Sequence, residues 1–295
     1  MASTQDLKRR VRSITNTRKV TKAMELVASA RLRRSQQRIE SMRPYADRMV
    51  ELMAGVSRAA GSVRLPLLDR RENVQRVAIV PVTADRGLAG GFNAQVVRRS
   101  LALMREVQAN GQEVVWFSTG RKAASTLRFR RLDVAQSWTG FSERPAYRDA
   151  QAVAHAISEA FVNREVDRVV IVYNAFVSAL VQRVTVRDLL PIPQEALEQA
   201  AEDGATGGTP DFIYEPEPEE ILARLLPVYV ETELYRALLE SAASEQGARM
   251  TAMRNASKAA GELIDNLTLA MNRARQAEIT QEILEVVAGA DALAG

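Results

Sequence analysis

Residues 76–83 read RVAIVPVT, and this short run decides the class of domain in the middle of the chain. Two similar runs follow it: QEVVWFS (112–118) and DRVVIVYN (167–174). All three are rich in β-branched and aromatic residues, as buried strands are. Helical patterns lie between them, near 94–108 and 146–162. Because strands that alternate with helices build largely parallel sheets, these runs predict a compact, Rossmann-like α/β domain.

The limits of this domain follow from the segments beside it. A further strand pattern covers 176–187, and residues 194–209 are polar and Gly-rich, which is typical of a loop. We therefore expect the α/β domain to occupy 59–210, between an N-terminal helical segment, 1–58, and a C-terminal one, 211–295.

The N-terminal segment has the pattern of one long helix. Between Gln5 and Val56 there is one glycine, and from residue 28 apolar or small residues recur every three or four positions. This heptad-like seam is Ala28, Leu32, Ser35, Ile39, Met42, Tyr45, Met49, Leu52 and Val56. Pro44 lies inside it and is expected to bend the helix, because it removes one backbone donor.

The C-terminal segment predicts a second long helix. It opens with YEPEPEEI (214–221), in which Pro218 and the acids after it suit a helix start. The pattern continues to about Val287, with a possible kink at Pro227. Its later seam is Ala260, Leu263, Leu267, Ala270, Ala274, Ala277, Gln281 and Leu284.

Charge favours the pairing of the two terminal helices. Residues 1–58 hold fourteen Lys/Arg against five Asp/Glu, a net of +9, and 211–295 hold seven against fifteen, a net of −8. Helices that flank one domain are expected to form a long antiparallel coiled coil. If Val56 lies beside Glu217, the numbers of paired residues add up to about 273.

With that register the last helix outruns its partner beyond residue 272. The remaining segment is apolar on more than one face, at Ile279, Ile283, Leu284, Val286, Val287 and Leu293. A helix that is apolar on most sides has to be enclosed, either by another protein or by folding back on the central domain.

Composition excludes several kinds of site. The chain has no cysteine, so it has no disulfide, thiolate metal site or thiol nucleophile. Its one histidine, His155, cannot build a zinc site by itself. No run of eighteen uncharged apolar residues is present, so we expect membrane association only through partners.

Five stretches resemble conserved blocks of the gamma subunit family of F-type ATP synthases, in the same order. They are TRKVTKAMELVASARLRRSQ (17–36), DRGLAGGFN (85–93), YEPEPEEIL (214–222), ASEQGARMTAM (243–253) and NRARQAEITQEILEVVAGADAL (272–293). The resemblance implies a two-helix rotor shaft with an α/β domain near the membrane, coupling proton-driven ring rotation to ATP synthesis or hydrolysis. It implies no catalytic residue, cofactor or metal in this chain.

The same resemblance implies the binding partners of the chain and its location in the cell. The shaft would turn inside a hexamer of alpha and beta subunits, with an epsilon subunit and a membrane rotor ring as further partners. The position would be peripheral, on the cytoplasmic face of a bacterial cell membrane.

Carried over position by position, the family pattern implies three contact regions. The first would face the acidic lever segment of a beta subunit: Lys19, Lys22 and Met24. The second would meet the catch loops above it: Arg249, Gln276, Thr280 and Glu282. The third would belong to the foot on the rotor ring: Tyr214 and Glu215.

Two of the contact regions have plainer alternatives. The lysines, with Arg31, Arg33 and Arg34, could be a solvated helix face, and Met24 could be ordinary packing between the helices. Tyr214 could pack locally on the start of the last helix.

Three alternative interpretations of the sequence are disfavoured. A dinucleotide-dependent oxidoreductase is disfavoured because Gly87, Gly90 and Gly91 do not have the G-x-G-x-x-G spacing, and the second strand ends without an acidic residue. Nucleic-acid binding, suggested by the basic N-terminal segment, lacks interleaved aromatic residues between 8 and 34. A mitochondrial targeting segment is disfavoured because the family match begins by Thr17.

Overall fold

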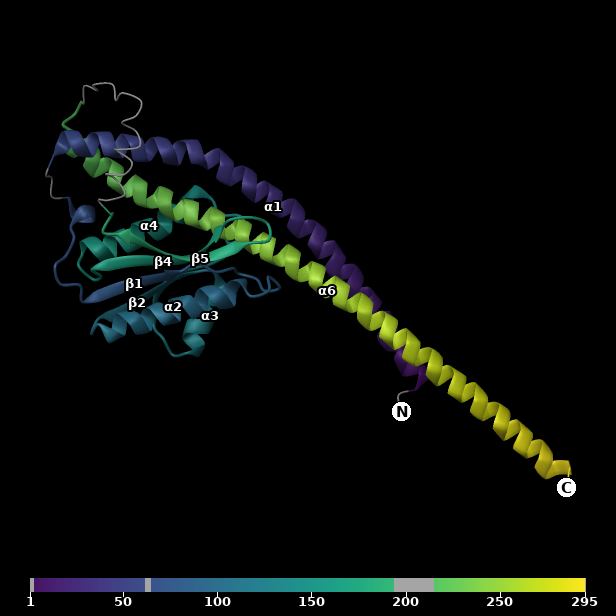
Figure 1. Ribbon diagram of the computed structural model, residues 1–295. Helices are drawn as coiled ribbons and strands as arrows, with labels where there is room; N and C mark the ends of the chain where they lie inside the picture. The colour runs from purple at the N-terminus through teal and green to yellow at the C-terminus, as the bar shows by residue number, and fades with distance from the viewer. Residues whose placement is uncertain (1–2, 62–64, 194–214, 295) are drawn as a thin grey trace. The chain divides into compact units, whose positions relative to one another are not determined.

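The computed structural model describes residues 3–61, 65–193 and 215–294 (Figure 1). Its elements, in chain order, are α1 (Thr4–Ala60), the short 3-10 helix η1 (Pro66–Leu68), β1 (Arg76–Pro81), α2 (Phe92–Ala109), β2 (Glu113–Thr119), α3 (Arg121–Phe129), β3 (Val134–Trp138), α4 (Tyr147–Val162), β4 (Arg168–Phe176), β5 (Gln182–Leu190) and α6 (Pro218–Ala294). The chain divides into two compact units, Ser29–Arg249 and a smaller unit made of Met1–Ala28 and Met250–Gly295. Both long helices, α1 and α6, contribute residues to each unit.

The larger unit contains a five-stranded sheet in the order β3-β2-β1-β4-β5. The first four strands are parallel to their neighbours, and β5 pairs antiparallel with β4. The predicted α/β fold is confirmed, and the runs at 76–83, 112–118 and 167–174 form β1, β2 and β4. The fourth pattern, 176–187, is β5, which begins six residues later than predicted because a turn first closes the hairpin.

Three elements were not predicted: η1, β3 and α3. Strand β3 has five residues at the edge of the sheet and none of them is buried, so it has no run of apolar residues. Helix α3 has only nine residues. Short elements of this kind give little periodic signal.

Alternate residues of the central strands enter two separate cores. Val77 and Ile79 of β1 pack on one face of the sheet, with apolar side chains of α2 and α3. Ala78 and Val80 pack on the other face, against α4, α6 and the last turns of α1. Figure 1 shows α2 and α3 on one side of the sheet, with α4 and α6 on the other. The domain thus has helices on both faces, as doubly wound sheets do.

In the larger unit, the seam of α1 departs from the prediction after Pro44. Tyr45 and Leu52, predicted in the seam, are 51% and 49% exposed, whereas Ala46 and Met53 are buried. The helix continues through Pro44, so the strict alternation of fours and threes carries on unbroken to Val56. The predictions for Tyr45 and Leu52 were therefore wrong by one position, whereas Met49 and Val56 are buried as predicted.

The smaller unit is an antiparallel pair formed by 3–28 and 250–294. Thr4 Oγ1 donates a hydrogen bond of 2.6 Å to Glu278, and Arg254 Nε donates one of 3.0 Å to Glu25. A Cβ on Gly261 would lie 3.5 Å from the guanidinium carbon of Arg18. The antiparallel direction is thereby confirmed within this unit.

The predicted register, with paired numbers adding up to about 273, is wrong. Glu25 and Arg254 add up to 279, and Thr4 and Glu278 add up to 282. Helix α1 runs to Ala60 rather than Val56, which accounts for most of the shift. The seam of α6 changes accordingly: Leu263 and Ala270 are exposed, and the neighbouring Ile264 and Met271 are half-buried instead.

Candidate functional site

The first candidate contact surface lies on the smaller unit, around Glu25. This carboxylate is almost fully buried, and it accepts hydrogen bonds from Arg254 on α6 and from Lys22 on α1, each 3.0 Å long. The hydrogen bond from Arg254, followed by that from Lys22, holds the pKa of Glu25 below its usual range. Both cations remain largely exposed, so they can still face a partner.

A shallow groove surrounds these ion pairs and is strongly basic. Among its lining residues are Arg18, Lys19, Lys22, Arg254 and Lys258, against the single acid Glu25. Large aliphatic side chains stand exposed on the same stretch of α1, namely Val20, Leu26 and Val27. A surface that combines cations with exposed aliphatics suits an acidic, partly apolar segment.

Lys19 and Lys22, predicted to contact a beta subunit, both line this groove and are exposed. Met24 lies on the same stretch of α1 and is half-buried. The structure therefore brings Lys19 and Lys22 together on one surface, with Met24 close to them in sequence.

The second candidate surface is the last part of α6. Every residue from 275 to 290 is exposed, including the predicted contacts Gln276, Thr280 and Glu282. Thr280 donates its hydroxyl hydrogen to the backbone oxygen of Gln276 at 2.9 Å, a bond inside the helix. The aliphatics of this stretch are uncovered too: Ile279, Ile283, Leu284, Val286 and Val287 are 46–72% exposed.

Arg249 lies elsewhere, inside the larger unit. Its side chain is 8% exposed and donates a hydrogen bond of 2.7 Å to Glu245, one turn earlier on α6. Burial raises the pKa of Glu245, and the neighbouring Arg249 opposes that rise. Arg249 is thus engaged within its own chain.

Of the two predicted foot residues, the structure describes Glu215. Tyr214 lies outside the described residues. Glu215 is exposed just before α6, which begins at Pro218 as predicted.

Doubly wound sheets hold nucleotides at the carboxyl edge of the sheet. Ligands bind such folds outside the carboxyl ends of the strands where the strand order reverses, here between β1 and β4. At this edge, a cavity of about 10 Å³ lies beside Thr83, Thr119 and, from α6, Ser241 and Glu245. That volume holds about one water molecule, so α6 covers the ends of β1 and β2.

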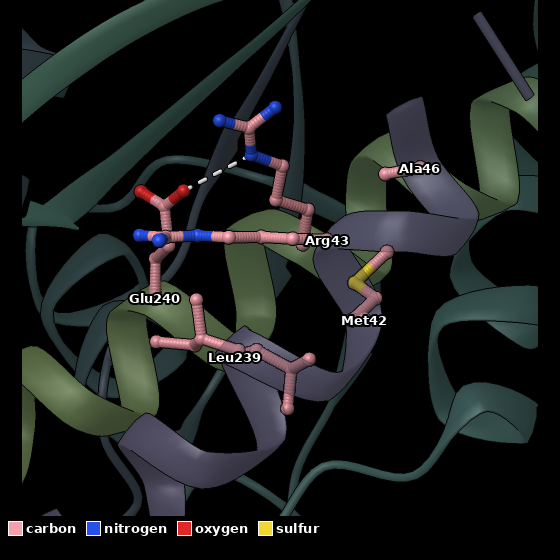
Figure 2. Close-up of a pocket in the computed structure, with 7 residues that line it drawn as sticks. Met42, Arg43, Ala46, Leu239 and Glu240 are labelled. Carbon is pink, nitrogen blue, oxygen red and sulfur yellow. Dashed lines mark hydrogen bonds and ion pairs between the residues drawn. The ribbon is translucent and has the colours of Figure 1, made fainter. Parts of the chain in front are cut away.

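A larger cavity, about 230 Å³, lies between α1 and α6 in the larger unit (Figure 2). Arg43 and Ala46 of α1 and Leu239 and Glu240 of α6 line it, and Arg236 donates to Glu240 at 3.1 Å. The lining residues include no paired acid and base of the kind that hydrolytic chemistry uses.

The described part of the chain contains no group of three His, Asp or Glu side chains that could hold a metal ion. Among the same residues, no helix is long and apolar enough to cross a membrane.

Sequence reasoning missed several residues of these surfaces. Arg254 and Lys258 were not singled out, because their place beside Lys22 depends on the register of the pair. Leu26 and Val27 could have been found, since they are apolar positions outside the seam of α1.

Comparison with known proteins gives consistent matches along the chain. A family model described as ATP synthase matches residues 3–293. The ATP synthase gamma chain of Rubrobacter xylanophilus is 49% identical, over 100% of this chain and 99% of its own. That of Paracoccus denitrificans is 44% identical, over 99% of this chain and 100% of its own.

Solved structures agree in fold. The chain is similar to one in the central stalk and c-ring structure of the Tetrahymena thermophila mitochondrial ATP synthase, with a TM-score of 0.59 and 28% identity, over 81% of this chain and 99% of that one. A chain of the Euglena gracilis mitochondrial ATP synthase rotor gives a TM-score of 0.65 at 17% identity, over 94% and 98%. At that identity the second likeness concerns the fold alone.

Proposed function

This chain belongs to the ATP synthase gamma chain family, and from that premise we propose that it is the central rotor shaft of an F-type ATP synthase. It couples proton-driven rotation of a membrane ring to ATP synthesis or hydrolysis in a hexamer of alpha and beta subunits. The observation that carries this proposal is the exposed end of α6. Residues 275–290 form a helix with uncovered aliphatics on several sides, as a segment enclosed by a partner would.

The basic groove of the smaller unit is the proposed contact with a beta subunit. Lys19, Lys22 and Met24 would meet its acidic lever segment as the shaft turns. Exposed ion pairs contribute about 0.2–1 kcal/mol each. Because these contacts are weak, the shaft can bind each of the three beta subunits in turn and still dissociate from it.

The exposed end of α6 is the proposed second contact, through Gln276, Thr280 and Glu282. Arg249 was expected to share it and remains a proposed contact, although its present bonds lie within the chain. Because a two-helix shaft has no threefold symmetry, it presents a different face to each beta subunit. Nucleotide affinities can then differ between the three sites only through these differing contacts.

We further propose that the chain catalyses nothing alone. The phosphate-loop pattern G-x-x-x-x-G-K-[ST] is absent from its sequence. In the larger unit, Ser241 and Glu245 of α6 lie over the ends of β1 and β2, and the cavity of about 10 Å³ that remains there is too small for a nucleotide. Hydrolysis and synthesis of ATP would belong to the alpha and beta subunits.

The remaining partners are proposed from family membership. An epsilon subunit and the membrane rotor ring would bind the chain, with Tyr214 and Glu215 in the foot on the ring. The protein would lie on the cytoplasmic face of a bacterial cell membrane, attached only through its partners.

Mixing the purified chain with the alpha and beta subunits of its own organism tests the proposal. We expect a complex with three copies each of alpha and beta per chain, and a fast, cooperative ATPase. By calorimetry, the chain alone should not bind ATP at micromolar concentrations. Micromolar ATP binding, or the lack of any complex, would contradict the proposal.

A further inference from the structure

Three arginines from three different parts of the larger unit converge on one carboxylate, Glu143. Arg31 of α1 donates a short hydrogen bond to Glu143 Oε2. Arg86, in the loop between β1 and α2, and Arg249 of α6 each lie 3.7 Å from Oε1. Glu143, in the segment between β3 and α4, therefore contacts both long helices and a loop at the carboxyl edge of the sheet.

Arg249 is the second centre of this group. Besides Glu143 and Glu245, it reaches the backbone oxygen of Gly87, to which its Nη2 donates at 3.3 Å. Glu245 and Arg249 are both buried, and their side chains are 1% and 8% exposed. We call Arg31, Arg86, Glu143, Glu245 and Arg249 the edge cluster.

The loops that carry the cluster are fixed by Asp85. Its carboxylate accepts backbone N–H hydrogen bonds from Gly140 at 2.8 Å and Ser142 at 3.2 Å, which hold the segment before α4. It also accepts the N–H of Arg121 at 3.0 Å, at the start of α3. These hydrogen bonds fix the backbone of the two segments that carry Glu143 and Arg86.

Helix α6 also contacts the sheet and its β4–β5 turn near this edge. Ser244 donates a hydrogen bond of 3.0 Å to the backbone oxygen of Asn174 in β4. A Cβ on Gly247 would lie only 3.0 Å from the backbone oxygen of Ala179.

The start of α6 is held to the domain as well. Apolar side chains of 222–238 pack in the core. Glu231 accepts a hydrogen bond of 2.7 Å from Tyr147 of α4, and Glu233 pairs with Arg187 of β5 at 2.6 Å.

We propose that Glu143 and Arg249 are positioning residues that transmit torque. Together they fix both long helices to the carboxyl edge of the sheet, so that a turn of the α/β domain turns both helices without slipping. This role rests on the proposed rotor function. The hydrogen bonds that Arg31 donates to Glu143, and Arg249 donates to Gly87 and Glu245, are charge-assisted and therefore directional, which suits a coupling element.

The test compares Glu143→Gln and Arg249→Gln with a matched control, Arg224→Gln. The control removes an ion pair of the same spacing on α6, but one whose side chains are 75% and 51% exposed. All three variants are made in the full chain. Glu143 is partly exposed and glutamine keeps its shape, so Glu143→Gln folds even if the more buried Arg249→Gln does not.

Two readouts are needed. In the isolated chain, we expect amides of 244–250 to exchange hydrogen about tenfold faster in Glu143→Gln than in the unaltered chain. In the complete complex in vesicles, we expect Glu143→Gln to keep ATP hydrolysis within about twofold, while protons pumped per ATP fall severalfold because α6 slips against the domain at the edge cluster. The control should change neither quantity.

Unchanged exchange in Glu143→Gln would show that the cluster does not hold α6. Suppose that hydrogen exchange in Glu143→Gln is faster but the number of protons pumped per ATP is unchanged. The cluster would then stabilise the fold without transmitting torque, and the torque proposal would also be overturned. If the unaltered chain fails to assemble with alpha and beta subunits, the rotor function itself fails. The exchange measurement then separates that failure from the absence of the contact.

Discussion

In the larger unit, Asp167 joins the start of β4 to the segment at the start of β1. It accepts N–H hydrogen bonds of 2.8 Å from Gln75 and Arg76, and it pairs with Arg71 at 2.5 Å. Burial alone would raise the pKa of Asp167, but the hydrogen bonds from Arg76, Arg71 and Gln75 outweigh burial, so the pKa is lowered. The folded protein therefore favours the charged form.

This lowered pKa predicts a pH-dependent effect of Asp167→Asn. The stabilisation is complete above the ordinary pKa of 3.8 and is lost as the pH falls through the lowered value. At pH 7 the variant should lose about 1.5–3 kcal/mol of unfolding free energy, as for hydrogen bonds to charged groups. Urea unfolding at pH 7 and pH 3 measures the loss, which should be smaller at the lower pH.

Asp188→Asn is the control, because the side chains of its ion pair with Arg168 are 40–45% exposed, against 13–14% for Arg71 and Asp167, and the pair should contribute less. An equal loss for Asp167→Asn at both pH values would show that charge has no part in the effect. The role of Asp167 was invisible in the sequence. It opens the run DRVVIVYN, but its partners lie about ninety positions earlier, and only the pairing of β1 with β4 brings them together.

Among the elements, the end of α6 carries the clearest prediction. Deleting residues 284–295 should weaken assembly with the alpha and beta subunits, because exposed Leu284, Val286 and Val287 lose their place in the partner. The α/β domain should stay folded, as judged by circular dichroism. Sedimentation of the mixed subunits measures assembly.

A finer version replaces Ile283 and Val287, one turn apart, with serine. Each aliphatic that a partner buries contributes about 1.5–3 kcal/mol, so the apparent dissociation constant should rise at least tenfold. Glu285→Gln, between them, should leave the constant nearly unchanged. Equal binding by all variants would show that this end is not enclosed, and loss of the domain fold would show that it packs internally.

Periodicity predicted the existence of the long elements but not their phase. Helix α6 starts at Pro218 as expected, because proline and acids favour a helix start whatever surrounds them. In the seam of α1, Tyr45 and Leu52 were each predicted one residue too early, and the register of the pair was wrong by six or more residues. Register depends on where α1 ends, and the chain around Ala60 carries only a weak stop signal, a single glycine.

At the scale of the whole molecule, five sequence blocks identified the family, whereas the surroundings of each predicted contact residue depend on the fold. Lys19 and Lys22 line an exposed groove as a contact surface requires, but Arg249 is turned inward by Glu245 and Glu143. The sequence block that contains Arg249 is the same whether the arginine contacts a partner or pairs with acids of its own chain. Only the fold brings Glu143, from a distant loop, beside it.

Rotation is the central claim, and disulfide cross-linking tests it most directly. The chain has no cysteine, so each introduced thiol is unique. Thr21 and Ala260 add up to 281, between the observed sums of 279 and 282, and both side chains are at least half-buried in the smaller unit. A pair of cysteines there should bridge, since a disulfide needs Cα atoms less than about 7 Å apart.

The measurement is ATP turnover by the assembled complex, before and after oxidation. With Thr21→Cys and Ala260→Cys bridged, turnover should remain nearly intact, because both helices turn together. With Met24→Cys bridged to a cysteine on a facing beta subunit, turnover should stop and return when a reductant is added. Full turnover in the complex bridged between Met24→Cys and beta would contradict rotation of this chain.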